Sequence, residues 1–213
     1  MTVTRLFALL LPLLLWSLPA KAHPHVWIAV TSEIVFKDGK IAAIRHHWTF
    51  DDMYSAFVTA NIGNAKNGPT SADLEPIAQT NVRELKEFSY FTFPKEAGRK
   101  IGFGEPTDIS MTYDAKTQQA TLHFTLPLQG PITGRAFAFQ IYDPSYFVAF
   151  AFEKGDGAVK LMGAPQGCSL TVTKPKGLDE DESKKLNESF FSGLSPGADF
   201  GIKLADRALV ACP

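Results

Sequence analysis

Residues 25–36, HVWIAVTSEIVF, and residues 41–50, IAAIRHHWTF, decide the fold of this chain. Both stretches are rich in β-branched and aromatic residues, as strands are, and the KDGK sequence at 37–40 between them predicts a hairpin turn. Alternate side chains of the second stretch share one largely apolar face: Ala42, Ile44, His46, Trp48 and Phe50. The sequence therefore predicts a β-hairpin that covers a hydrophobic core with one face.

Beyond the hairpin the pattern becomes helical and then returns to strands. Residues 51–60 and 70–88 carry apolar side chains at three- and four-residue steps, with Asp51 or Asp52 as the expected N-cap of the first helix and Thr70 as that of the second. A polar helix is expected at 179–191. Further strands are expected at 90–93, 109–113, 120–128, 135–142, 146–152, 159–162, 169–173 and 208–212. This order predicts an α+β fold, predominantly antiparallel β in sandwich-like sheets, with two or three covering helices.

The first 22 residues have the parts of a cleavable signal peptide. Arg5 supplies the positive charge, residues 7–18 form the apolar stretch, and Ala-Lys-Ala at 20–22 is a small-x-small cleavage site. Cleavage there makes His23 the new amino terminus, whereas the alternative cleavage after Ala20 leaves that histidine third from the end. No second apolar run of membrane-spanning length follows, so we expect a periplasmic protein without stable membrane insertion after cleavage.

The mature region, 23–213, is long enough for one sizeable core or for two small subdomains. A boundary near 98–104 would divide it into 23–100 and 101–213. The formal net charge of −1 gives no overall attraction to nucleic acid, so no nucleic-acid partner is expected.

The two cysteines, Cys168 and Cys212, both belong to the exported region. In an oxidising compartment the default expectation is one structural disulfide. A pair of metal ligands and two free thiols are the alternatives, although no CxxC spacing supports a metal site.

Four of the five histidines lie within 25 residues of one another: His23, His25, His46 and His47. Pairing of the hairpin strands is expected to bring the two amino-terminal histidines near the other two and near Asp51. Imidazoles, a terminal amine and a carboxylate form a first shell for zinc, nickel, cobalt or copper. The simpler alternative is that His46 packs beside Trp48 in the core and that His23 and His25 belong to a frayed terminus.

Two further polar residues lie in strand-like surroundings. Asp143, in QIYDPSYF, is a candidate sixth metal ligand, although Asp-Pro is also typical of a turn. His123, in the apolar stretch ATLHFTL, is expected in the core. No GxSxG, HExxH, Walker or GxGxxG motif is present in a suitable context, so the sequence does not predict an enzyme.

Four segments together resemble one family: AHPHVWI, RHHWTFDDMYSAF, LKEFSYFTF and QIYDPSYF. This is the exported family of unknown function labelled 1007, often described as periplasmic components of ABC-type transport systems. The resemblance spans essentially the whole mature chain, both cysteines included. It implies capture or delivery of a divalent metal for an inner-membrane transporter, with His23, His25, Asp51 and Asp143 as the first positions to carry over.

One segment departs from the family. Many relatives have an EF-hand-like DxDxDGxLSxxE stretch between the first two helices, and the matching residues 61–71 here, NIGNAKNGPTS, have lost its acidic ligands. Calcium requires several anionic oxygens, so no calcium site is expected in this loop.

The favoured hypothesis is a periplasmic accessory protein that binds a divalent transition metal for transport or homeostasis. A copper-dependent oxidoreductase is the rival, because an amino-terminal His23 could bind copper through both its amine and its ring, in a histidine brace. A third hypothesis is a structural or assembly β-protein whose histidines are incidental.

Overall fold

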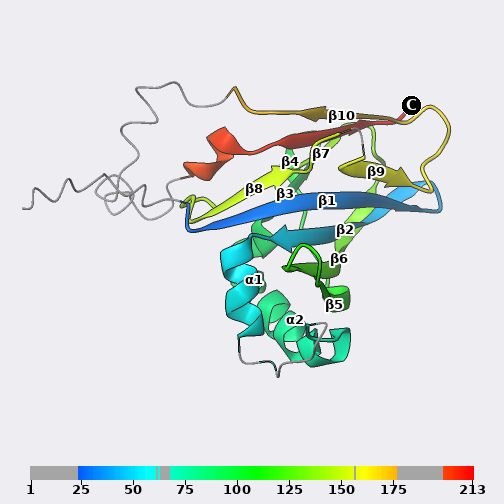
Figure 1. Cartoon of the computed structure of the whole chain (residues 1–213). Helices are drawn as coiled ribbons and strands as arrows, with labels where there is room; N and C mark the ends of the chain where they lie inside the picture. The colour runs from blue at the N-terminus through cyan, green and yellow to red at the C-terminus, as the bar shows by residue number, and fades with distance from the viewer. Residues whose placement is uncertain (1–23, 61, 63–67, 156, 177–198) are drawn as a thin grey trace, which may run out of the picture.

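In the computed structural model, two β-sheets stack face to face and enclose the core, with two helices at one end (Figure 1). The structure describes residues 24–60, 62, 68–155, 157–176 and 199–213. The predicted signal peptide, the predicted helix at 179–191 and most of the predicted calcium-free loop lie outside the described residues.

Sheet A is built around the predicted hairpin. Its strands are β1 (Val26–Lys37), β2 (Lys40–Phe50), β5 (Thr107–Asp114), β6 (Gln119–Ile132), β8 (Val148–Phe152) and β9 (Val159–Met162). The order is β5-β6-β2-β1-β8, and β9 also pairs with β1. All pairs are antiparallel except those of β1 with β8 and β9, which are parallel.

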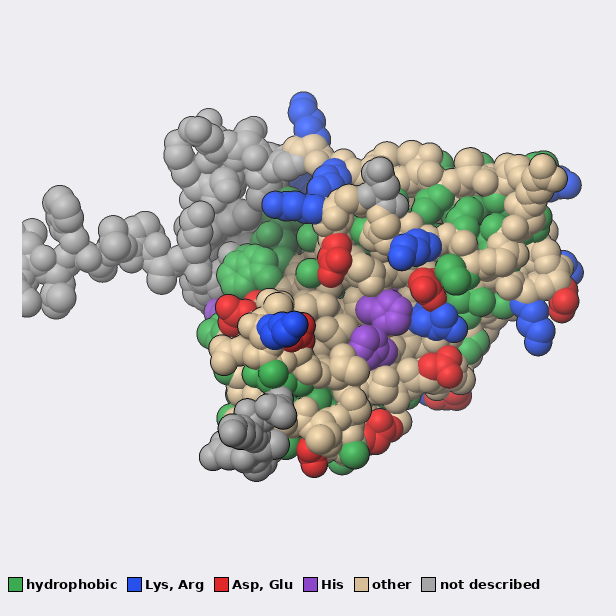
Figure 2. Space-filling model, turned by 45° about the vertical axis from the view of Figure 1, so that its right-hand side comes forward, with side chains coloured by type: hydrophobic (Ala, Val, Ile, Leu, Met, Phe, Trp, Pro, Cys, Tyr) green, Lys and Arg blue, Asp and Glu red, His purple; other side chains and the backbone are tan. Residues whose placement is uncertain are grey.

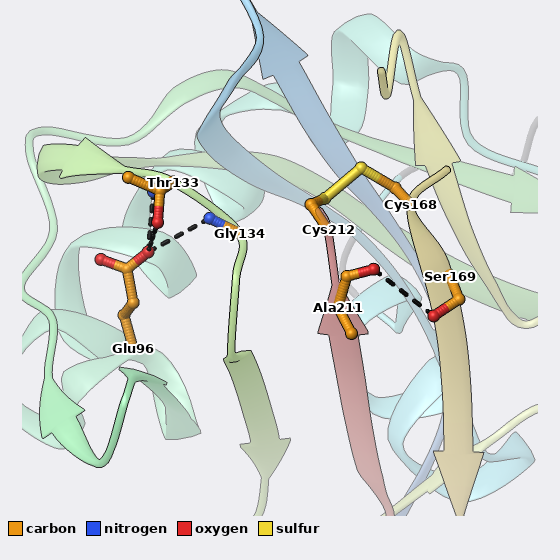
Figure 3. Close-up of a disulfide and its surroundings, with 7 residues drawn as sticks. All are labelled: Glu96, Thr133, Gly134, Cys168, Ser169, Ala211 and Cys212. Carbon is orange, nitrogen blue, oxygen red and sulfur yellow. Dashed lines mark hydrogen bonds between the residues drawn. A yellow bond between two sulfur atoms is a disulfide. The ribbon is translucent and has the colours of Figure 1, made fainter. Parts of the chain in front are cut away.

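Sheet B is antiparallel throughout its described strands and covers the inner face of sheet A. Its strands are β3 (Thr92–Glu96), β4 (Arg99–Lys100), β7 (Phe137–Ile141), β10 (Ser169–Thr173) and β11 (Arg207–Ala211), in the order β10-β11-β7-β3-β4. A disulfide joins Cys168 to Cys212 at the end of the β10–β11 pair, which confirms the predicted bond (Figure 3). Close by, Glu96 accepts hydrogen bonds from the backbone N–H groups of Thr133 and Gly134.

The two α-helices begin at the predicted cap residues. Asp51 caps α1 (Asp52–Thr59) by accepting from the backbone N–H of Tyr54, and Thr70 caps α2 (Ser71–Leu85) in a reciprocal capping box with Asp73. Helix α2 packs against β5 and β6 through its apolar stripe, of which Leu74 and Ala78 are fully buried. The helices therefore cover the part of sheet A that sheet B leaves open.

The segment after α2 differs from the prediction. Residues 90–93 were expected to form a strand, but a 3₁₀ helix, η1 (Lys86–Phe91), runs to residue 91 and β3 begins at Thr92. Ser89, Tyr90 and Phe91 have φ values of 53°, 53° and 47°, so three successive residues with side chains adopt the left-handed conformation. This costs roughly 1–2 kcal/mol for each residue, and the surrounding packing must compensate for it. A second 3₁₀ helix, η2 (Gly201–Leu204), precedes β11.

Strands from both sides of the predicted boundary near 98–104 interleave in both sheets. In sheet A, β2 pairs with β6 and β1 with β8; in sheet B, β3 pairs with β7. The described parts of 23–100 and 101–213 therefore share one core, and the predicted α+β fold of sandwich-like sheets is confirmed. Among the described helices, none is long and apolar enough to cross a membrane.

The two faces of sheet A differ sharply. The inner face carries fully buried aromatic side chains, among them Trp48 and Phe124, and Phe152 of this sheet contacts Phe139 of sheet B. The outer face carries threonines, charged residues and two adjacent histidines, and it is open to solvent (Figure 2). Because side chains alternate along a strand, neighbouring residues of β2 lie in these two environments.

Candidate functional site: a histidine pair on sheet A

His46 and His47 point to opposite faces of β2. His46 is fully buried, its Nδ1 lies 2.8 Å from Ser32 Oγ, and its Nε2 lies 3.3 Å from Thr92 Oγ1. Burial, reinforced by the nearby His47, lowers the pKa of His46 to about 3, so its ring is neutral at any physiological pH. His46 is therefore a hydrogen-bonded core residue with both ring nitrogens engaged inside the core, as in the alternative that the sequence also allowed, and we do not include it in the candidate site.

On the outer face, His47 of β2 lies directly opposite His123 of β6 in the antiparallel register. The two Nδ1 atoms are 2.6 Å apart, and the two rings lie side by side on the exposed surface of the sheet (Figure 2). His123 was expected in the core, but Leu122 and Phe124 on either side of it face inward and leave it on the outer face. The structure thus pairs two histidines that are 76 residues apart in sequence.

A threonine orients the second ring. Thr112 of β5 places its Oγ1 2.8 Å from Nε2 of His123. If Nε2 carries the proton and donates to this hydroxyl, Nδ1 is left as a lone pair facing His47. Hydrogen bonds of this kind, from the non-ligating nitrogen of a histidine, fix the tautomer and ring orientation in metal sites.

Burial is the main reason that both rings of the pair are neutral. Burial lowers the pKa of His47, the Glu33 carboxylate opposes this effect, and the Arg45 guanidinium adds to it. Burial also lowers the pKa of His123, and the neighbouring His47 lowers it further. Glu33 and Arg45 are themselves joined by an ion pair of 2.6 Å. Neutral imidazole is the form that binds a transition metal, so the lowered pKa values of both rings favour metal binding at neutral pH.

The spacing of the two nitrogens is close to the bite of a metal chelate. Two imidazole nitrogens at about 2.0–2.1 Å from one ion are about 2.9–3.4 Å apart for bond angles between 90° and tetrahedral. The observed 2.6 Å is a hydrogen bond in which one ring donates and the other accepts, so a bound metal replaces the shared proton, separates the two nitrogens by a few tenths of an ångström and turns both lone pairs toward itself. Two side-chain ligands leave the remaining coordination positions open to water or to another molecule.

The other predicted ligands lie at the far end of the hairpin. Thr31 is the β1 partner of His47, and His25 lies six residues before it, about 20 Å away along the strand. His25 is exposed at the start of β1, with its ring centroid 4.6 Å from that of Phe147. Pairing of the hairpin therefore does not bring His25 to His46 and His47 as predicted. His23 lies outside the described residues.

The two predicted carboxylate ligands are occupied by backbone N–H groups. Asp51 accepts from Trp27 and Tyr54, both at 2.7 Å, so one carboxylate joins β1 to the start of α1. The buried Asp143 accepts from the backbone of Ser145, Phe147 and Val148 at 2.9–3.0 Å. Both carboxylates serve as structural caps, and the part of the chain that the structure describes contains no group of three or more histidine, cysteine, aspartate or glutamate side chains placed to hold a metal.

The alternation of residues around His123 could have shown that this histidine lies on the outer face of the sheet, but the prediction for this residue did not use it. In ATLHFTL, Leu122 and Phe124 alternate with His123, and the same rule that separates His46 from His47 places His123 opposite the apolar side chains. What the sequence could not supply was the register between β2 and β6, which brings His123 to His47 rather than to another residue of β2.

Comparison with known proteins places this two-sheet β-protein in a family. The model of the family described as "Protein of unknown function (DUF1007)" matches residues 8–212, and the chain belongs to that family. A protein of Haemophilus influenzae (strain ATCC 51907 / DSM 11121 / KW20 / Rd), described as an uncharacterized protein, is 23% identical over 209 residues, covering 97% of this chain and 98% of the relative. No solved structure matches the chain.

Proposed function

We propose that this protein is a periplasmic accessory protein that binds a divalent transition metal, zinc, nickel, cobalt or copper, on the outer face of sheet A. The observation that carries the proposal is the pair of Nδ1 atoms of His47 and His123, 2.6 Å apart on an exposed surface. The hydroxyl of Thr112 supports it, since a hydroxyl that accepts from Nε2–H of His123 leaves Nδ1 of that ring as the nitrogen that can ligate.

A metal ion held by only two protein ligands keeps open coordination positions, which suits transfer of the ion to another protein better than storage. Structural metal sites are closed by four protein ligands, whereas sites that exchange their fourth ligand leave a position open. Two histidines on a flat, solvent-exposed sheet hold an ion that a second protein can approach directly. An inner-membrane metal transporter is the partner we propose, in agreement with the role that the family resemblance implies.

Export to the periplasm is part of the same proposal. The signal-like amino terminus supports it, and so does the Cys168–Cys212 disulfide, because such bonds persist in oxidising compartments. In the reducing cytosol the two thiols would stay reduced and this disulfide would not persist.

Titration calorimetry of the untagged exported protein with each of the four metals tests the proposal. We expect one metal ion per chain, and we expect His47→Gln and His123→Gln each to weaken binding at least about tenfold, which is about 1.4 kcal/mol. His25→Gln is the matched control, because it removes an exposed histidine immediately before β1 without touching the pair.

The same three variants identify the alternative site. Loss of affinity in His25→Gln, with unchanged binding in the other two variants, would move the metal to the amino-terminal end of β1. Unchanged binding in all three variants, or no binding by the parent protein, would refute a histidine-based metal site.

A further inference from the structure

A cavity with a polar and aromatic lining lies along β3 of sheet B, whereas the histidine pair lies on the outer face of sheet A. The cavity has a volume of about 520 Å³ and is bounded by η1, β3, β4, the segment 101–104, Tyr142, Asp199 and η2. We propose that this cavity binds a small organic anion with a flat, unsaturated body. The inference does not depend on metal binding.

Two lysines supply the cationic end of the cavity. Lys95 of β3 and Lys100 of β4 are direct partners in the antiparallel register, so both side chains project from the same face of the hairpin. Like charges placed directly opposite each other destabilise a sheet, and an anion between them removes the penalty. Among the described residues, no carboxylate lies within ion-pair distance of either lysine.

The other charges of the lining are already engaged. Lys86 forms an ion pair of 2.6 Å with Glu105, and Asp199 accepts a hydrogen bond of 3.1 Å from the hydroxyl of Tyr142. Three lysines against two carboxylates leave the described lining with one positive charge in excess, and that excess is located at Lys95 and Lys100.

Aromatic rings form the walls. Phe93 and Tyr142 stack with their centroids 4.3 Å apart, and Tyr90 meets Phe103 edge to face at 5.7 Å. Flat ligands bind such walls by offset or edge-to-face contact. The combination of an apolar aromatic wall with a cationic end fits an aromatic or conjugated carboxylate better than a bare inorganic anion.

The strained backbone lies on the same wall. Ser89 and Tyr90, two of the three left-handed residues, line the cavity. The backbone carbonyl of Tyr90 accepts from the hydroxyl of Thr92, which also contacts the buried His46. Backbone strain of this kind persists where surrounding contacts enforce it and is concentrated at binding sites. Here the contacts hold the Tyr90 ring against the cavity.

Titration calorimetry with 2-naphthoate, on the full protein in EDTA, tests the proposal. We expect saturable binding that weakens about tenfold or more in the Lys95→Gln/Lys100→Gln double variant, since both charge-assisted contacts to the carboxylate are lost. The matched control is Lys37→Gln/Lys40→Gln, which removes an equally charged cross-strand lysine pair from the β1–β2 hairpin, outside the cavity. Binding by the control should equal that of the parent.

Two further ligands separate charge from shape. Uncharged 2-naphthalenemethanol should bind the parent at least about tenfold more weakly than 2-naphthoate and should be indifferent to the lysine substitutions. Inorganic phosphate should not displace 2-naphthoate at equal concentration. No binding of 2-naphthoate, equal binding of the uncharged analogue, or equal affinity in the Lys95/Lys100 variant would overturn the proposal. Circular dichroism of both double variants checks that the sheets are intact.

Discussion

The inner face of sheet A holds His46 between Ser32 and Thr92, whereas the outer face holds His47 against His123. The two residues are adjacent in sequence and in the same strand, yet the first has no solvent exposure and the second is half-buried at an open surface. Hydrogen bonds to hydroxyls use both ring nitrogens of His46. The difference teaches that position on the pleat, rather than residue type or clustering in sequence, decides which histidine is available to a ligand.

The first test of this comparison is stability. His46→Ala should lower the free energy of unfolding by about 3 kcal/mol, because it leaves a cavity and removes the hydrogen-bond partner of the buried Ser32 hydroxyl. His47→Ala, on the surface, should change it by less than about 1 kcal/mol. Urea denaturation of the metal-free protein measures both values. Equal losses would show that the two faces of β2 do not differ in the way described.

The second test is the pH dependence of stability. The native pKa of His46 is about 3, below the value of about 6.5 in an unfolded chain, so between these pH values the unfolded state binds more protons. The stability contributed by neutral His46 is complete above pH about 6.5 and is lost as the pH falls below that value. Between pH 7.5 and 5 the free energy of unfolding should fall by about 2 kcal/mol from this residue.

His46→Leu isolates that contribution. The variant cannot titrate at this position, so its stability should depend less on pH than that of the parent over the same range, even though it is less stable overall. Denaturation at several pH values in EDTA supplies both curves. Parallel curves for parent and variant would mean that other groups, and not His46, cause the acid sensitivity.

The sequence predicted most of the sheet but less of the site. Alternation located β1 and β2 to within about a residue and put His46 on the same face as Trp48, which is where the structure has it. Asp51 was expected either as a helix cap or as a metal ligand. The structure has it as the cap, because its carboxylate accepts hydrogen bonds from two backbone N–H groups. Local patterns are sufficient for such features, since each depends on residues close in sequence.

The rest depends on contacts between distant segments. The partner of His47 is set by the β2–β6 register, and the left-handed turn at 89–91 is imposed on residues with side chains by the packing around them. The disulfide is a long-range feature that the sequence did predict, because two cysteines in an oxidising compartment allow a single intramolecular pairing. Where many pairings are possible, as among strands, a single sequence does not choose between them.

The smallest expected effect concerns the residue that orients the outer pair. Thr112→Val keeps the shape of the side chain but removes the hydroxyl 2.8 Å from Nε2 of His123, so the ring loses the contact that orients it. Metal affinity should fall about fivefold, which is about 1 kcal/mol, with unchanged stoichiometry. Thr121→Val is the matched control, because Thr121 lies on the same face and bonds only to Thr49 among the described side chains. If both variants bind metal as the parent does, His123 is oriented by its contact with His47 alone, and the outer face is a less prepared site than its geometry indicates.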